Sequence, residues 1–264
     1  MISKLLFTSR GAADIIKVLL HKNIVFAERW NVAKALGKIK IVSLSKQLNE
    51  PFVFRLGKWT INCLYNRHIG FLVKEIFVEE VYSTKKNVEI NKILDLGSNI
   101  GLSVAYFKMR FPCAVLQAYE PDKNSYDLLQ KNVQENEWKN VSSYETAVSD
   151  NNGFLFAEIQ EEKASVNSNF ATVGKEEAGV SAKDIVEILQ ECFDIIKIDI
   201  EGGEWKVLKK IIQHQLISKA NNWFIEFHDL ENNKKQFEEI LNCFKENGFE
   251  KEERKEVVYF YKNR

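Results

Sequence analysis

The sequence predicts an α/β fold in which helices cover a mostly parallel sheet. From about residue 89 onward, short apolar runs typical of buried strands alternate with longer amphipathic runs typical of helices. A turn that contains two glycines joins the first of these strands to the first helix, and acidic residues directly follow several strands. Strands and helices that alternate in this way are connected by right-handed crossovers. A ligand of such a fold binds at the carboxyl ends of the strands.

An N-terminal elaboration is expected over residues 1–88. The segment up to about Leu48 has a helical pattern, and apolar residues alternate on both sides of a turn at Gly57, which predicts a β-hairpin. A helix is expected over residues 71–82. No proline-, glycine- or serine-rich linker follows, so the elaboration is expected to lead directly into a second domain over residues 89–264.

The second domain is expected to alternate strands and helices along its length. The predicted strands are residues 92–96, 115–120, 141–148, 193–199 and 223–227. The predicted helices are residues 101–110, 123–136, 205–212 and 233–247. A further candidate strand covers residues 154–159. Two closing runs, residues 249–252 and 257–261, predict a terminal antiparallel hairpin.

The composition argues against several classes of protein. The chain has 264 residues, of which 45% are hydrophobic and 28% are charged, so it is expected to be globular. Its 37 basic and 37 acidic residues give no net charge, which predicts no nucleic-acid partner. The four cysteines form no C-x-x-C pair, so no zinc cluster is expected, and reduced thiols fit a cytoplasmic location. No run approaches the ~20 apolar residues of a membrane span.

The most informative run is Asp95-Leu96-Gly97-Ser98-Asn99-Ile100-Gly101, between a predicted strand and a predicted helix. Glycines let the backbone turn sharply beside a ligand, and the helix N-terminus offers free N–H groups. A dinucleotide fingerprint has the spacing G-x-G-x-x-G, which this run does not match. The spacing Asp-x-Gly-x-x-x-Gly is instead similar to that of S-adenosylmethionine (SAM) methyltransferases of the Rossmann-like class. An ordinary strand-to-helix turn in another α/β protein is the alternative.

Acidic residues that follow later strands are candidates for ligand binding. Glu120, which precedes Pro121, could accept hydrogen bonds from ribose hydroxyls, or it could be a solvated acid beside a helix start. Asp199 and Glu201 follow an apolar run, where carboxylates are costly to bury unless they are paired or used. Glu204 fits equally well an ordinary acid in the first turn of a helix.

His228 follows the fifth predicted strand, after Glu226 and before Asp229. A lone histidine after a strand is more often structural than catalytic. Because the carboxyl ends of parallel strands meet at one edge, His228 is expected to lie near the Asp199 loop. That expected position makes it a candidate general base.

Together, these runs resemble the FkbM family of SAM-dependent methyltransferases over roughly residues 70–262. Further matching positions are Leu129, Asn132, residues 147–150, Gly153 and residues 197–204. The chain departs from the family at Gly203, where alanine is usual, which is a small change because both residues permit close packing. The resemblance implies a Rossmann-like class I methyltransferase fold, SAM as the cofactor, and methyl transfer to a hydroxyl of a sugar or small natural product.

The resemblance also implies which residues bind SAM. Asp95 would lie near the methionine amino group, and the Gly97–Gly101 backbone would surround the methionine part. Glu120 would hold the ribose, with Ala147 and Val148 beside the adenine. The implied cofactor-binding residues are Asp95, Gly97, Ser98, Asn99, Gly101, Glu120, Pro121, Ala147 and Val148.

An acceptor hydroxyl must lose its proton during transfer, and two hypotheses stay open for that step. In the first, His228 is the general base, and Asp199 or Glu201 orients it. In the second, Asp199, Glu226 and Asp229 bind Mg²⁺, which lowers the pKa of the hydroxyl.

The acceptor is expected to be a small molecule or a saccharide. Polar residues 165–172 form either an acceptor loop or a surface loop without a role. Trp59, Tyr65 and Tyr82 could face a sugar ring, although core packing is favoured. Two other functions stay open, namely a non-catalytic SAM-binding protein and an N-methyltransferase on another acceptor. A nucleic-acid N-methyltransferase is expected to carry an Asn/Asp-Pro-Pro-Tyr-like run where this chain has Asp199-Ile200-Glu201-Gly202.

Overall fold

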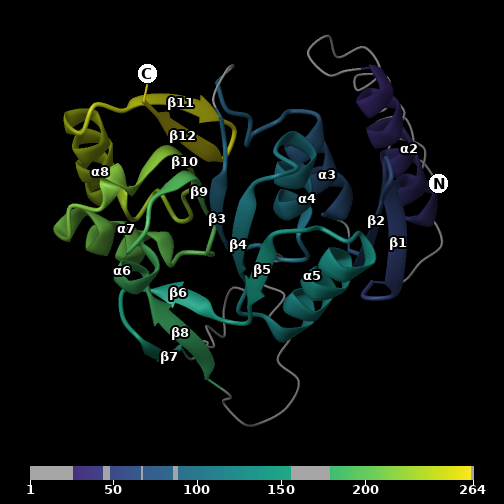
Figure 1. The fold of residues 1–264 in the computed structure, drawn as a ribbon, viewed down its shortest axis with the longest axis horizontal. Coiled ribbons are helices and arrows are strands. Elements are labelled where there is room, and N and C mark those ends of the chain that lie inside the picture. The colour runs from purple at the N-terminus through teal and green to yellow at the C-terminus, as the bar shows by residue number, and fades with distance from the viewer. Residues whose placement is uncertain (1–25, 44–47, 67, 86–88, 156–178, 263–264) are drawn as a thin grey trace.

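The computed structural model describes residues 26–43, 48–66, 68–85, 89–155 and 179–262. Its centre is a seven-stranded sheet in the order β11-β12-β10-β9-β3-β4-β5 (Figure 1). The strands are β3 (Lys92–Leu96), β4 (Val115–Tyr119), β5 (Val141–Tyr144), β9 (Phe193–Ile198), β10 (Ala220–Glu226), β11 (Glu250–Arg254) and β12 (Val257–Tyr261). β10, β9, β3, β4 and β5 are parallel, and β12 runs antiparallel to both β10 and β11. The predicted mostly parallel sheet with a terminal antiparallel hairpin is confirmed.

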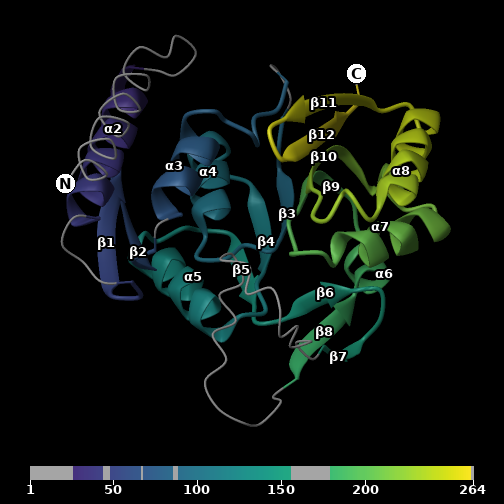
Figure 2. The same ribbon diagram turned by 180° about the vertical axis from the view of Figure 1, so that it is seen from behind.

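Helices cover both faces of the sheet, which explains why its central strands are apolar on both sides. The helices are α3 (Ile69–Phe77), α4 (Leu102–Arg110), α5 (Lys123–Glu135), α6 (Ile185–Ile188), α7 (Glu204–Gln213), the short 3-10 helix η1 (Ile217–Lys219) and α8 (Lys234–Glu246). Successive residues of β3 enter different cores. Ile93 packs with residues of α3 and α4, and Leu94 packs with residues of α7 and α8. Both views show α6, α7 and α8 beside β9 and β10, away from α3, α4 and α5 (Figures 1 and 2).

The described part of the N-terminal elaboration consists of α2 (Phe26–Val42), β1 (Pro51–Leu56), β2 (Trp59–Leu64) and α3. The predicted hairpin is present, and Gly57 turns it with a φ of +63°. Asn132 of α5 is fully buried, and its Oδ1 accepts a hydrogen bond from the backbone N–H of Asn62 at 2.7 Å. Its Nδ2 donates to the Ile100 carbonyl at 2.9 Å, so one side chain joins the hairpin to the glycine turn. The domain division after residue 88 stays a prediction.

Two elements differ from the prediction. Residues 141–148 do not form one strand, because β5 ends at Tyr144 and the chain then leaves the main sheet. The continuation forms a separate sheet of β6 (Ala147–Ser149), β8 (Val180–Asp184) and β7 (Gly153–Leu155). β8 and α6 were not predicted, because both are short and β8 is largely polar. The helix expected over residues 71–82 ends at Phe77, and Glu80 has a φ of +51°, which a helix does not allow.

Several predictions fall on residues outside the described ranges. These are the helical pattern before Phe26, the end of the candidate strand at residues 154–159, and the polar residues 165–172. Within the described ranges, every helix is too short or too polar to span a lipid bilayer.

Candidate active site

Except for Ala147 and Val148 in β6, the predicted site residues lie at one edge of the main sheet, where β3, β4, β9 and β10 end. β3 lies between β4 and β9, and β9 lies beside β10, so the loops that follow these strands are neighbours. The backbone N–H of Asp199 donates to the Leu96 carbonyl at 3.0 Å, and that of Gly97 donates to the Tyr119 carbonyl at 2.9 Å. Backbone hydrogen bonds therefore join the loops that follow β3, β4 and β9.

The two glycines of the turn lie where a side chain would meet neighbouring atoms. Gly97 has a φ of +81°, and a Cβ added there would lie 1.7 Å from the carbonyl oxygen of Asp199. Gly101 has a φ of +90°, and a Cβ there would lie 2.7 Å from Cδ1 of Leu129. The buried Ser98 folds its hydroxyl back onto the Asp95 carbonyl at 3.0 Å. Glycine at both positions therefore lets the turn pack closely against the loop after β9 and against α5.

Glu120 lies against this turn, as its position at a strand end predicts. The backbone N–H of Asn99 donates to Oε2 of Glu120 and that of Asp122 donates to Oε1, each at 2.8 Å. Pro121 connects the acid to the start of α5. Burial raises the pKa of Glu120 to about 7, although the two backbone hydrogen bonds act in the opposite direction. Each carboxylate oxygen keeps a further lone pair, so Glu120 can also accept hydrogen bonds from a ligand.

Lys197 of β9 is a buried cation that the sequence analysis did not single out. Its Nζ lies 3.2 Å from Oδ1 of Asp95 and 3.4 Å from Oδ2 of Asp199, and it donates to the Gly97 carbonyl at 2.8 Å. Burial alone would lower the pKa of Lys197, but Asp95 and Asp199 raise it, so the side chain stays charged. Asp95 is fully buried, and its Oδ2 accepts from the Ser103 hydroxyl at 2.6 Å. The available signal for this pair was a lysine between two isoleucines in a buried strand.

Glu204, which was not expected to do so, orients His228. Nδ1 of His228 lies 3.2 Å from Oε1 of Glu204, and the backbone N–H of His228 donates to the same oxygen at 2.6 Å. Glu204 is fully buried, and its Oε2 accepts from the backbone N–H of Gly202 at 2.8 Å. Glu204 therefore contacts Nδ1, in place of the expected Asp199 or Glu201. The physical reason is the positive φ of Glu201 and Gly202, which turns the chain sharply before α7 begins at Glu204.

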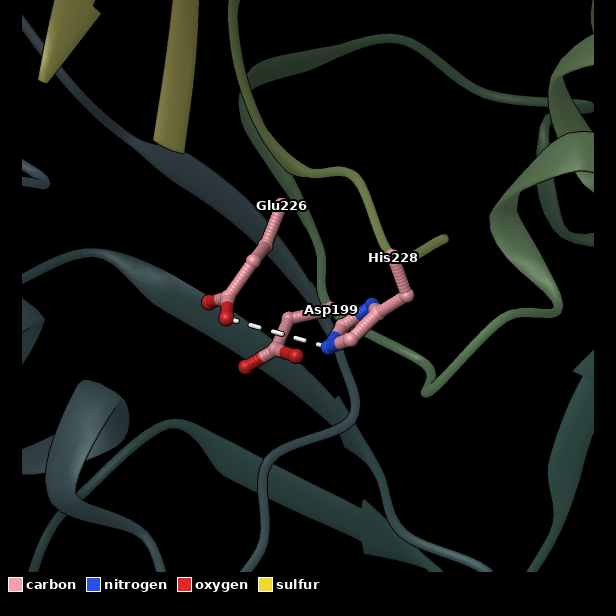
Figure 3. A group of neighbouring side chains, drawn as sticks. All are labelled: Asp199, Glu226 and His228. Atoms are coloured by element: carbon pink, nitrogen blue, oxygen red, sulfur yellow. Dashed lines mark ion pairs between the residues drawn. The ribbon is translucent and has the colours of Figure 1, made fainter. Parts of the chain in front are cut away.

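Nε2, the other ring nitrogen of His228, lies among carboxylates. It is 3.6 Å from Oε2 of Glu201 and 3.7 Å from Oε1 of Glu226. Asp199, Glu226 and His228 point toward one another (Figure 3), and each offers one ligand atom within 4.8 Å of the others. Asp229, the expected third metal ligand, does not belong to this group, because its carboxylate accepts a hydrogen bond from the turn that follows it. His228 takes its place.

The cluster carries an excess of negative charge. Burial alone would lower the pKa of His228, but the hydrogen bond to Glu204 and the charges of Glu204, Glu201 and Asp199 raise it to about 9. Burial, followed by the charge of Asp199, raises the pKa of Glu226 to about 8. Both shifts favour the protonated form, so the cluster is suited to neutralisation by a cation.

The residues considered for contact with the adenine and with the acceptor ring are buried. Ala147 and Val148 lie in β6, and Val148 shares a core with Leu96 and Tyr119, which end β3 and β4. This core contact places β6 beside the edge where the site lies. The three aromatic residues considered for acceptor binding are core residues, as favoured: Trp59, Tyr65 and Tyr82.

Comparison with known proteins gives a family match over most of the sheet domain. The family described as "Methyltransferase FkbM domain" matches residues 95–251. The chain is 24% identical over 198 residues to "Methyltransferase sdnD" of Sordaria araneosa, which covers 62% of this chain and 76% of that protein. It is 26% identical over 165 residues to "Methyltransferase 1" of Beauveria bassiana (strain ARSEF 2860), which covers 53% of this chain and 66% of that protein.

One solved structure with a similar fold is that of Methyltransferase FkbM from Methylobacillus flagellatus KT. The two chains are 15% identical with a TM-score of 0.49. The match covers 96% of this chain and 59% of the other, so this chain spans less than two thirds of that protein.

Proposed function

Since this chain belongs to the FkbM family of methyltransferases, we propose that it is a SAM-dependent O-methyltransferase acting on a hydroxyl of a saccharide or small natural product. The observation that carries the proposal is the Glu204–His228 pair, which lies at the sheet edge that also holds the glycine turn and Glu120. A histidine whose Nδ1 is fixed by a carboxylate, and whose Nε2 faces the sheet edge where the acceptor is proposed to bind, has the arrangement of a general base. An acceptor hydroxyl needs such a base, since it must lose a proton.

The residues at the edge fit SAM by their chemistry. The Gly97–Gly101 backbone is proposed to surround the methionine part, and its two glycines let the turn pack against Asp199 and Leu129. Glu120 is proposed to accept from the ribose hydroxyls, with Pro121, Ala147 and Val148 toward the adenine. Asp95 is proposed to lie beneath the methionine part, where it holds Lys197 and, through Lys197, the turn.

In the proposed mechanism, His228 and Glu204 remove the proton of the acceptor hydroxyl. SAM, when bound, supplies a methyl group that is already activated for transfer to a nucleophile. The site holds the acceptor oxygen in line with that methyl group, and positioning of this kind is worth up to ~7–11 kcal/mol in favourable cases. As the new bond to oxygen forms and the bond between the methyl carbon and sulfur breaks, with its electron pair left on sulfur, the hydroxyl proton would pass to Nε2 of His228. Glu204 stabilises the resulting imidazolium through Nδ1.

A divalent cation is the second candidate for activating the hydroxyl, and the arrangement of Asp199, Glu226 and His228 favours it. Two carboxylates and one imidazole form a mixed oxygen and nitrogen ligand set. Mg²⁺ prefers oxygen ligands alone, so this set suits Mn²⁺, Co²⁺ or Zn²⁺ better. Transfer that survives exhaustive chelation would remove the cation from the mechanism, and transfer restored by one added metal would support it.

Transfer of a labelled methyl group from SAM to a panel of saccharides and hydroxylated natural products tests the proposed function. The expected product is a methyl ether, and His228→Ala is expected to abolish its formation while SAM still binds. Methylated amines as the only products would instead support an N-methyltransferase. SAM binding without transfer to any acceptor in the panel would favour a non-catalytic SAM-binding protein.

A further inference from the structure

Glu75 of α3 is a buried carboxylate whose side chain is only partly satisfied. The residue is 6% exposed, and its Oε1 has no hydrogen-bond partner among the described residues. An unpaired buried oxygen of an ionisable group costs free energy in the folded protein. A side chain kept under these conditions is a candidate for contact with a ligand.

Glu75 belongs electrostatically to the active-site edge. The charge of Asp199 raises the pKa of Glu75, and the charge of Glu75 raises the pKa of Glu226. All three charges raise the pKa of the buried Tyr82. In the turn between β11 and β12, Glu256 raises the pKa of Glu75 and Lys255 lowers it. Since Val257, the first residue of β12, pairs with Glu226, this turn lies at the same edge of the sheet. Glu75 of α3, the β11–β12 turn and the ends of β9 and β10 therefore lie near one another at this edge of the sheet.

The cations near Glu75 are held by other acids. Lys255 forms an ion pair with Glu79, Lys197 lies between Asp95 and Asp199, and His228 is bonded to Glu204. Burial, followed by the charge of Glu256, raises the pKa of Glu75 to about 7. Carboxylates thus exceed the cations available to them on this side of the site. An anionic acceptor would be repelled there, whereas an ammonium group would be attracted.

We propose that Glu75 binds an ammonium group of the acceptor, so the hydroxyl that is methylated belongs to an amino sugar or a related amino alcohol. The inference rests on the proposed function and names the acceptor class for the same site. It also gives the N-terminal elaboration a role, because Glu75, which determines the acceptor class, lies in α3. The recognition is a charge-assisted hydrogen bond between the ammonium group and Oε1 of Glu75.

Calorimetry with the full chain tests this inference with three probes of the same ring size. Glucosamine, glucose and glucuronate are titrated in buffer with EDTA, with and without saturating S-adenosylhomocysteine, the demethylated product of SAM. Glucosamine is expected to bind at least about tenfold more tightly than glucose, as a charge-assisted hydrogen bond predicts. Glucuronate is expected not to bind. Glucosamine that binds no better than glucose, including no binding of either, would overturn the inference.

Two variants separate a role in recognition from a role in folding. Glu75→Gln has the same shape and is expected to remove the preference for glucosamine while S-adenosylhomocysteine binds unchanged. It is also expected to raise Tm, because it removes an incompletely paired buried charge, whereas a structural role predicts a lower Tm. Glu79→Gln is the matched control, since Glu79 is paired with Lys255, and it should keep the preference. A preference that persists in Glu75→Gln would contradict the inference.

The outcome for S-adenosylhomocysteine keeps the two proposals distinguishable. If the product does not bind, the SAM-dependent function itself fails. If it binds but the amino sugar is not preferred, only the assignment of Glu75 and of the acceptor class fails.

Discussion

Nδ1 of His228 lies 3.2 Å from Oε1 of Glu204, a side chain that is fully buried. The same oxygen accepts a hydrogen bond from the backbone N–H of His228 at 2.6 Å, so the carboxylate fixes both the ring and the backbone of this residue. With Nδ1 engaged, Nε2 faces Glu201 and Glu226. Glu204 is therefore a positioning residue for the proposed base.

Glu204→Gln is expected to lower kcat, because a neutral amide stabilises the imidazolium less than a carboxylate does. General-base catalysis contributes roughly 10²–10⁴-fold, which bounds the loss. The dissociation constant for SAM should stay unchanged, since Glu204 lies outside the proposed SAM-binding residues. Glu201→Gln is the comparison, and its effect should be smaller because its side chain is 60% exposed. Steady-state kinetics that show equal kcat for Glu204→Gln and the wild type would contradict the assigned role.

The rate is expected to rise with pH. A base accepts a proton only when it is unprotonated, and the surrounding acids raise the pKa of His228 to about 9. The logarithm of kcat/KM should therefore increase from pH 7 and level off above pH 9. In Glu204→Gln the midpoint should move down, toward the ordinary histidine value of about 6.5. A flat profile between pH 7 and pH 9 would argue against His228 as the base.

Gly97→Ala is expected to destabilise the protein strongly and to abolish SAM binding. The new Cβ would lie 1.7 Å from the Asp199 carbonyl oxygen, so the loops after β3 and β9 would have to separate. Gly248→Ala is a matched control, because its φ of +80° resembles the +81° of Gly97 but no atom lies within 4 Å of its Cβ. The control should lose only the ~1–2 kcal/mol of a left-handed residue. Urea unfolding and SAM titration of both variants test the difference, and equal losses would contradict the close approach.

Lys197→Met is expected to cost ~3–5 kcal/mol of unfolding free energy, because it leaves Asp95 charged and buried without its cation. The control Lys92→Met removes a partly exposed lysine paired with Glu191, and a surface pair is worth ~0–1 kcal/mol. Adding Asp95→Asn to Lys197→Met should recover part of the loss. Urea unfolding measures all three variants. A loss for Lys197→Met no larger than that for Lys92→Met would show that the buried pair is not needed.

The sequence allowed the position of the cofactor-type residues to be predicted, because parallel strands all end at one edge. The position of Glu120 beside the glycine turn agrees with that rule, although its hydrogen bond from Asn99 was not predicted. The role of Glu204 did not follow, since an acid in the first turn of a helix also suits the helix dipole. Its contact with His228 depends on how far the loop before α7 turns, which the residue pattern does not encode.

Side-chain and strand pairings between distant segments also could not be predicted from the sequence. Lys197 and Asp95 are far apart in the chain and meet only because β3 and β9 are adjacent strands. The separation of β5 from β6 has the same origin. The pattern of residues 141–148 suits a strand throughout, but β6 pairs with β8, which follows much later in the chain. Partner choice is a tertiary property that local periodicity does not reveal.

Calorimetric titration with SAM, with NAD as a control and Glu120→Ala alongside, tests the central claim most directly. Micromolar SAM binding and no NAD binding are expected. Glu120→Ala should weaken SAM binding roughly tenfold or more, because it removes the acceptors of two charge-assisted hydrogen bonds. Glu145→Ala, which changes a more exposed acid in the next loop along the sheet, should bind SAM as the wild type does. No SAM binding by the wild type, or a preference for NAD, would contradict the proposed SAM-dependent function.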